Sequence, residues 1–228
     1  MKGMRGGERR GRRAAAGAER GSRPPAEAAP LAREFFERPP LEVAPALLGK
    51  LLLRRWRGIW LAGRIVEVEA YLGREDPAAH AWRGPTPRNR VLFGPAGHAY
   101  VYLIYGLHTC LNVSTLPAGE AGCVLLRALQ PAMAGAAGPG GETTPKTMSG
   151  PGRLTRVLHI GRALNGRDLT QAGDLYLADD GWPARLAEAE RREWSEIRVT
   201  RRIGISRARE LPARFYLAAS RAVSGPRQ

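Results

Sequence analysis

Apolar residues are spaced as in helices near the start of the chain and alternate as in strands further on. Leu31–Phe36 and Leu41–Leu53 carry apolar residues at helical spacing, broken by prolines, which predicts short helices that pack on a sheet. Residues 64–72 alternate between polar side chains and β-branched or small apolar ones, which predicts a strand. Residues 73–97 are rich in Gly, Pro, Arg and Asn, which predicts a loop of a length that is usually functional.

The centre of the chain predicts an antiparallel meander. Its strands are expected at Tyr100–Tyr105, Leu107–Thr115 and Cys123–Leu129, with turns at Gly106 and within 117–122. The remaining elements are expected in the order surface loop at 132–149, helix at 153–160, charged helix-prone segment at 183–194, and closing strands at 197–205 and 214–217. Together they predict an α+β fold, a single domain with a curved, mostly antiparallel β-sheet flanked by short helices.

The composition narrows the class of protein. Hydrophobic residues make up 43% of the 228 residues, which is enough for a packed core, and the length fits one domain. No apolar run approaches the roughly 18 residues of a membrane-spanning helix, so we expect no membrane association. Two cysteines are too few for a disulfide scaffold. These features favour an intracellular protein.

Basic residues outnumber acidic ones, and the formal net charge is +15. Residues 1–30 hold eight Lys or Arg, three Asp or Glu and almost nothing that could anchor a core, which predicts a disordered basic arm. The folded domain expected over 31–228 keeps the remaining +10, which favours a polyanionic partner such as nucleic acid. Arg-rich usage in a GC-rich genome is the alternative, since the chain has only three lysines.

Two carboxylates and a phenol share one face of the predicted strand at 64–72. Alternation assigns the polar residues Glu67, Glu69 and Tyr71 to one face and the apolar residues Val66, Val68 and Ala70 to the other. If the apolar face meets the core, the polar face suggests a concave site in which a carboxylate is needed as a general base. The alternative is an exposed strand face whose carboxylates pair with nearby arginines.

Tyrosines are concentrated in the next predicted strand, and one arginine interrupts an apolar strand. Tyr100 and Tyr102 share a face, and Tyr105 stands at a turn, where an aromatic ring can act as a wedge between bases. Ordinary strand aromatics are the alternative. Arg127 is the single charge in Cys123–Leu129, and since burying it is costly without a partner, we expect a carboxylate or a bound anion to face it.

Metal ligation is not indicated. The four histidines and the two cysteines show no paired ligand spacing, which argues against zinc, and we expect no cofactor. Cys110 and Cys123 are most simply explained as buried strand residues.

Several segments, taken in order, resemble one family. Gly63–Gly73, Ala79–His80, Thr86–Arg90, Tyr100–Gly106, Leu111–Ser114, Val124–Leu129, Gly150–Leu154 and Arg202–Ile205 are similar to motifs of the alkyladenine (3-methyladenine) DNA glycosylase family. The resemblance covers roughly residues 33–218. It implies a monofunctional enzyme that flips alkylated or deaminated purines out of double-stranded DNA and hydrolyses their N-glycosidic bond in base excision repair. The motifs contain no lysine for a Schiff base, in keeping with hydrolysis without strand cleavage.

The resemblance also implies roles for single residues. Glu69 matches the carboxylate that positions and deprotonates the attacking water, and Arg127 matches the arginine that helps to hold both; we expect Arg127 to keep Glu69 ionised. The remaining matches are Tyr71, His80 and Tyr102 as walls of the base pocket, Tyr105 as the residue inserted into the duplex, and Asn112 as the screen against the amine of guanine.

Other expectations follow from the same resemblance. It implies a monomer without a cofactor, in the cytoplasm and, in a bacterium, at the nucleoid. Residues 81–85 are shorter by one than in some members, so which arginine there touches phosphate stays open. Arg198 and Arg202 are further candidates for contact with the DNA backbone.

Two other functions remain open at this stage. A non-catalytic basic nucleic-acid-binding protein would share the charge and the aromatics but would leave the two glutamates and Arg127 unused. A carbohydrate hydrolase could use Glu67 and Glu69, whose backbones stand roughly 6.5–7 Å apart on one strand, near the inverting separation of about 6.5–9.5 Å. The basic charge disfavours it, because a neutral sugar needs no cationic surface.

Overall fold

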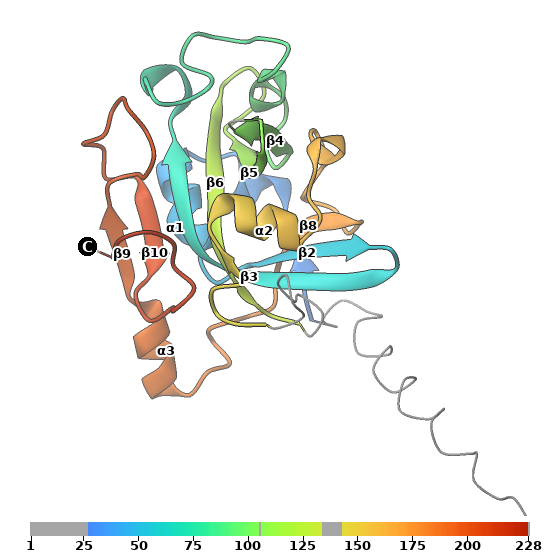
Figure 1. Ribbon diagram of the computed structural model, residues 1–228, viewed down its shortest axis with the longest axis vertical. Coiled ribbons are helices and arrows are strands. Elements are labelled where there is room, and N and C mark those ends of the chain that lie inside the picture. Colours follow the sequence, from blue (N-terminus) through green and yellow to red (C-terminus); the bar gives the residue numbers. More distant parts are fainter. Residues whose placement is uncertain (1–26, 105, 134–142, 228) are drawn as a thin grey trace, which may run out of the picture.

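The computed structural model describes residues 27–104, 106–133 and 143–227 (Figure 1). Most of the predicted basic arm and Tyr105 therefore lie outside the described residues. The last two residues of that predicted arm, Ala29–Pro30, form strand β1 and pair with β8 (Leu175–Asp179), so the sheet begins two residues before the expected domain boundary.

An antiparallel sheet that curls around the core organises the described chain (Figure 1). Its main path is β1-β8-β2-β3-β6-β5-β4, with β10 and β9 continuing from β3 and β7 pairing with β6. The strands not yet given are β2 Leu51–Trp56, β3 Ile59–Tyr71, β4 Ala99–Ile104, β5 His108–Thr115, β6 Gly122–Pro131, β7 Met148–Ser149, β9 Ile197–Thr200 and β10 Arg214–Leu217. The α+β prediction with short flanking helices is confirmed.

The described helices are short: α1 Pro40–Leu47, α2 Pro151–Val157 and α3 Glu188–Ser195, with 3-10 turns at Arg33–Phe35, Gly73–Glu75, Arg90–Phe93 and Arg162–Leu164. Of these short helices, α1 and α2 pack on this sheet, whereas α3 has no buried residue. Val43 and Leu47 of α1 and Leu154 of α2 enter the main core cluster together with strand residues such as Val68 and Val124. No described helix is both long enough and apolar enough to cross a bilayer.

The predicted helix at 41–53 is wrong in its second half. Helix α1 ends at Leu47, Gly49 follows with a φ of 85°, and β2 begins at Leu51. Leu52 enters the main core, whereas Leu51 and Leu53 enter a second cluster on the other face. A strand that is buried on both faces has no polar alternation, and its apolar run is hard to distinguish from a helix by periodicity.

Strand β3 starts earlier than the alternation at 64–72 suggested. Arg57 and Gly58 have φ angles of 49° and 81° and close a two-residue hairpin between β2 and β3, and two positive φ angles at the centre are typical of such turns. Three shorter elements also differ from the predictions. Strand β8 was not expected, β7 lies inside the predicted loop at 132–149, and the strand predicted at 197–205 ends at Thr200.

A double irregularity interrupts the pairing of β3 with β6. The register runs from Ile65–Leu129 to Glu67–Ala128 and then to Val68–Leu126, so it skips Val66 on one strand and Arg127 on the other. Val66 therefore packs in a separate cluster from Val68, and the prediction that both share a face is wrong. Bulges of this kind redirect side chains and are common beside active sites.

Candidate active site

Neighbouring strands place a row of side chains on one face of the sheet. Glu69 of β3 lies opposite Leu125 of β6, and Leu125 lies opposite Asn112 of β5. Asn112 in turn lies opposite Tyr100 of β4. Directly opposed residues in antiparallel strands point to the same face, so residues more than 30 positions apart in sequence become neighbours.

Glu69 lies at one end of this row and is fully buried. Its Oε1 accepts a hydrogen bond of 2.7 Å from the Ile203 amide and lies 3.1 Å from Nη1 of Arg127. Its Oε2 accepts a hydrogen bond of 2.9 Å from the Tyr71 hydroxyl. A carboxylate fixed at both oxygens has little rotational freedom, which suits a group that must hold one reactant in place.

Burial has the largest effect on the acidity of this carboxyl group. It raises the pKa of Glu69 above the ordinary value, although Arg127, the Ile203 amide and the Tyr71 hydroxyl each lower it. The expected influence of Arg127 is therefore present, but complete desolvation outweighs it. A carboxyl whose pKa moves toward neutrality is better matched to general base catalysis than an exposed one.

Arg127 connects Glu69 to the second carboxylate, Glu67. Its Nε donates to Oε1 of Glu67 at 2.9 Å while its Nη1 lies against Glu69, and its Nη2 lies 3.3 Å from Oγ of Ser224. The expectation that a carboxylate faces the lone arginine of this strand is confirmed. The bulge that skips Arg127 in the pairing explains how one guanidinium reaches both glutamates.

Glu67 is fully buried and has donors on both oxygens. Arg214 of β10 donates to its Oε1 at 2.8 Å, and the Ser224 amide donates to its Oε2 at 2.5 Å. Nη2 of Arg214 also donates to the Ser224 carbonyl at 2.8 Å. The contacts form a linear sequence of alternating charge, Arg214–Glu67–Arg127–Glu69. Glu67 is thus enclosed by ion pairs and is not open to a sugar, which removes the basis for the carbohydrate hydrolase.

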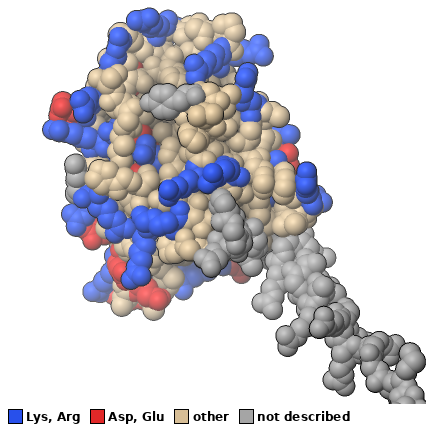
Figure 2. All heavy atoms as spheres, in the orientation of Figure 1, with Lys and Arg blue, Asp and Glu red and all other residues tan. Residues whose placement is uncertain are grey.

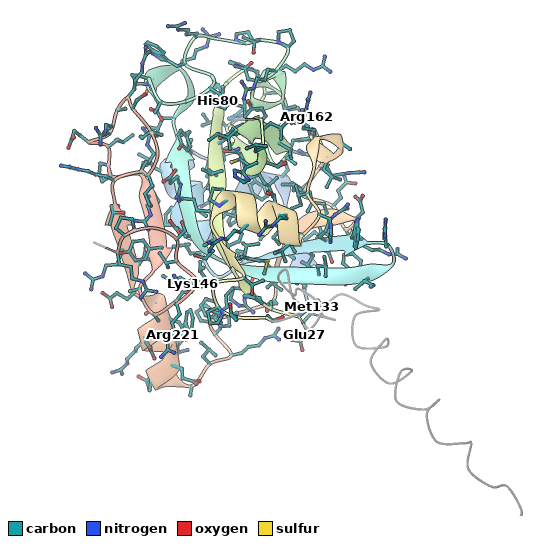
Figure 3. All side chains as sticks on the ribbon, viewed as in Figure 1. Glu27, His80, Met133, Lys146, Arg162 and Arg221 are labelled. Atoms are coloured by element: carbon teal, nitrogen blue, oxygen red, sulfur yellow. The ribbon has the colours of Figure 1, made fainter. Side chains whose placement is uncertain are left out.

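Aromatic rings form the other end of the row. The ring centroids of His80 and Tyr102 are 4.5 Å apart, and those of Tyr100 and Tyr102 are 5.3 Å apart. Nδ1 of His80 lies 2.9 Å from the Tyr100 hydroxyl. Partial burial and then the Arg88 guanidinium lower the pKa of His80, which favours the neutral ring. Figure 3 labels His80.

Tyr71 links the rings to Glu69. It packs with Tyr102 against the same small apolar cluster, and its hydroxyl bonds the carboxylate. Burial, and next the charge of Glu69, raise the pKa of Tyr71, so the phenol stays protonated and can donate. The Arg202 guanidinium lies 4.7 Å from the ring centroid of Tyr71 and pairs with both oxygens of Asp76. Arg202 is buried, so the expectation that it contacts DNA is wrong.

Asn112 and the cysteines complete this face. The Asn112 amide is buried and donates to the Tyr100 carbonyl at 3.3 Å, and Sγ of Cys123 lies 3.7 Å from its Oδ1. Cys110 and Cys123 are both buried in strands, as predicted. In the described part of the chain, no three His, Cys, Asp or Glu side chains come close enough to hold a metal ion.

The structure therefore gathers six of the seven expected site residues on one face, with Tyr105 outside the described residues. Sequence reasoning missed the Ile203 amide, Arg214 and the C-terminal segment at Ser224, because backbone donors and contacts between distant segments leave no periodic signal. The alternating strand at 64–72 did mark Glu67, but as a free carboxylate. Arg198, the other candidate for the DNA backbone, is exposed and pairs with Glu196.

A carboxylate held by an arginine and a phenol can act as a general base, and the aromatic rings beside it offer faces on which a flat ring system can stack. Comparison with known proteins identifies the family. The model of the family described as methylpurine-DNA glycosylase (MPG) matches residues 34–221.

Relatives named "Putative 3-methyladenine DNA glycosylase" are similar over most of the chain. The protein of Koribacter versatilis (strain Ellin345) is 49% identical over 210 residues, covering 89% of this chain and 96% of its own. That of Methanoculleus marisnigri (strain ATCC 35101 / DSM 1498 / JR1) is 50% identical over 193 residues, covering 83% and 96%. That of Carboxydothermus hydrogenoformans (strain ATCC BAA-161 / DSM 6008 / Z-2901) is 46% identical over 201 residues, covering 85% and 98%.

The chain belongs to the methylpurine-DNA glycosylase family. It is a DNA repair enzyme whose substrate is DNA and whose reaction is hydrolysis of the N-glycosidic bond between a base and its sugar.

Proposed function

We propose that the enzyme removes alkylated or deaminated purines, of the 3-methyladenine type, from double-stranded DNA, with Glu69 as the general base. The arrangement of Glu69 carries this proposal: a fully buried carboxylate that the Arg127 guanidinium, an amide and a phenol hold in place. Such a group can position one water molecule and accept its proton. The residues that surround it suit a base that has left the duplex.

The rings of Tyr71, His80 and Tyr102 are the proposed walls for that base. A glycosylase must rotate the nucleotide out of the stack, which costs a few kcal/mol, and each base–aromatic contact returns roughly 1–3 kcal/mol. Alkylation often leaves a purine cationic, and a cation is attracted to electron-rich ring faces. Because burial and Arg88 lower the pKa of His80 and so favour its neutral form, the ring adds stacking surface without repelling such a base.

Further roles fall to residues at the borders of this site. Asn112, which is fixed by its bond to the Tyr100 carbonyl, would reject the exocyclic amine of guanine. Tyr105, between β4 and β5 in the chain, would fill the space that the flipped nucleotide leaves.

In the proposed reaction the bond between C1′ and the base nitrogen breaks with its electron pair on the base. Positive charge develops on the sugar, as in other oxocarbenium-like transition states, and the ionised Glu69 stabilises it. A water oxygen forms the new bond to C1′ while its proton passes to Glu69. The products are the free base and an abasic sugar, and no group of the protein becomes covalently attached.

The cellular setting is part of the same proposal. We propose a monomer that works in the cytoplasm, and at the nucleoid if the organism is a bacterium, since its substrate is found there.

Glu69→Gln tests whether Glu69 is the general base. The amide keeps the shape of the side chain but accepts no proton, so single-turnover release of hypoxanthine or 3-methyladenine should fall at least about 100-fold, while binding to damaged duplex stays near wild type. The measurement is an excision panel on defined oligonucleotides. Glu34→Gln is a matched control on the 3-10 turn Arg33–Phe35 and should change nothing. Excision by Glu69→Gln at the wild-type rate would show that another group is the general base.

A further inference from the structure

The basic surface of the molecule does not select between damaged and undamaged purines. Figure 2 shows Lys and Arg side chains over much of the face in view, and such groups attract the phosphates of any duplex without reading its bases. Hypoxanthine differs from guanine only in lacking the exocyclic 2-amino group. The two bases must therefore be distinguished by a group that meets the base edge, and Asn112, the proposed screen, is only 2% exposed.

The two ends of the Asn112 amide have different partners. Its Nδ2 donates to the Tyr100 carbonyl at 3.3 Å, and its Oδ1 lies 3.7 Å from Sγ of Cys123. A backbone carbonyl can only accept a hydrogen bond, so the amide nitrogen must face Tyr100 and the amide oxygen must face the thiol. The thiol of Cys123 is then the donor. The chemistry of the two partners therefore fixes one orientation of the amide.

The sheet places Cys123 on the same face as the proposed site. Cys123 lies near the start of β6, opposite Tyr71 of β3 and Ser114 of β5. Asn112 precedes Ser114 by two positions, so the thiol and the amide are diagonal neighbours on one face. Cys123 belongs to the apolar cluster against which Tyr71 packs. Burial raises the pKa of Cys123 to about 12, so the thiol stays protonated and can donate.

We propose that Cys123 is a positioning residue that sets the selectivity against guanine by holding the Asn112 amide in one orientation. The inference rests on the proposed function, in which Asn112 meets the edge of the flipped base. While the thiol donates to it, Oδ1 of Asn112 stays turned toward β6 and does not accept from the 2-amino group of guanine. That amine then enters a buried site without a partner, which is costly. Without the thiol, the amide can turn and its oxygen can accept from the amine, so guanine is rejected less strongly.

Single-turnover excision from two duplexes tests this inference. They differ only in the target base, guanine or hypoxanthine opposite thymine. Cys123→Ala should raise the rate on guanine relative to that on hypoxanthine about fivefold, the effect of one weak neutral hydrogen bond. Cys123→Ser keeps a donor and should return this ratio toward wild type.

Val124→Ala is the matched control. It removes buried atoms from the next residue of β6, which enters the main core on the other face, and should leave the ratio of the two rates unchanged. A wild-type ratio in Cys123→Ala, or an equal rise in Val124→Ala, would overturn the inference.

The Asn112→Ala background shows whether the thiol acts through the amide. This variant lacks the proposed screen, so adding Cys123→Ala should not raise the guanine-to-hypoxanthine ratio further. A general loosening of the pocket would instead add the same factor again. An additive effect in the double variant would therefore contradict the positioning role of Cys123.

An infrared spectrum of the thiol gives a readout that does not depend on activity. In Cys110→Ala the chain keeps a single S–H group, that of Cys123, and its stretching band should lie at the lower frequency of a hydrogen-bonded thiol. Adding Asn112→Ala should move the band toward that of a free thiol, and an unmoved band would refute the bond. If wild type releases no hypoxanthine while the band moves as expected, the proposed function and the selectivity role are wrong and the thiol–amide contact stands.

Discussion

At the scale of single residues, the site depends on a carboxylate whose burial and whose hydrogen bonds oppose each other. Desolvation of Glu69 favours the protonated form, whereas Arg127, the Ile203 amide and the Tyr71 hydroxyl favour the ionised form. The resulting pKa is raised, so the active fraction of a general base falls when the pH drops through that raised value. The activity of this enzyme should therefore decline on the acid side at a higher pH than an exposed glutamate would allow.

Tyr71→Phe tests this balance. The substitution keeps the ring of the proposed pocket wall and removes one hydroxyl that lowers the pKa of Glu69. The acid limb of the single-turnover rate should move to higher pH, with little change in the rate on the plateau above it. The measurement is a rate–pH profile on hypoxanthine DNA, with Tyr176→Phe, in β8 outside the proposed site, as the control. An acid limb at the wild-type pH would mean that the phenol does not act on the ionisation of Glu69.

At the scale of elements, the irregular pairing of β3 with β6 determines which charges meet. The skipped residue Arg127 reaches Glu67 and Glu69, while Arg214 of β10 approaches Glu67 from the opposite neighbour of β3. Arg214 thereby neutralises part of the negative charge of Glu67, which would otherwise compete with Glu69 for Arg127. We regard Glu67 and Arg214 as positioning residues, since both are buried and reach Glu69 only through Arg127.

Arg214→Met should lower the free energy of unfolding and should also change the ionisation of Glu69. Removal of one partner from a buried ion pair costs about 3–5 kcal/mol, and Glu67 should then draw Arg127 away, which moves the acid limb of the rate to higher pH. Urea unfolding and the rate–pH profile measure the two effects. Arg198→Gln on the adjacent β9 breaks an exposed pair with Glu196 and should cost less than about 1 kcal/mol. A loss of stability without any shift in the pH profile would mean that Arg214 has a purely structural role. Arg214→Lys should partly restore both the stability and the pH profile.

The same elements show how far sequence patterns could lead. Alternation found the strand that carries Glu69, and the lone charge in an apolar strand found Arg127, because both signals are local. The bulge is not local: it arises from the fit of two strands about 60 residues apart, so alternation placed Val66 on the wrong face. The prediction of a helix where β2 lies was wrong for a related reason. Burial on both faces removes the alternation that distinguishes a strand from a helix.

At the scale of the whole molecule, the two ends of the described chain pack at different places. Ala29–Pro30 adds a strand beside β8 at one edge. The C-terminal segment instead packs behind the proposed site, where Ala222 and Val223 are fully buried and Ser224 meets both Glu67 and Arg214. Because Ser224 satisfies the charges beneath Glu69, the site depends on a segment 157 positions from Glu67 in the sequence.

Truncation of the C-terminus tests this dependence. A chain that stops after Arg221 loses two buried apolar side chains and leaves Glu67 and Arg214 without their backbone partners at Ser224. Buried apolar groups are worth roughly 1–3 kcal/mol each, and an unsatisfied charged group costs at least as much, so the urea midpoint should fall sharply and excision should be lost. A chain that stops after Gly225 keeps those contacts and loses residues 226–228, with the bond from Arg214 to the Pro226 carbonyl and the bond from Arg227 to the Ser220 carbonyl. It should retain most of its stability and its excision rate. If the two truncations behave alike, the segment at 222–224 does not support the site.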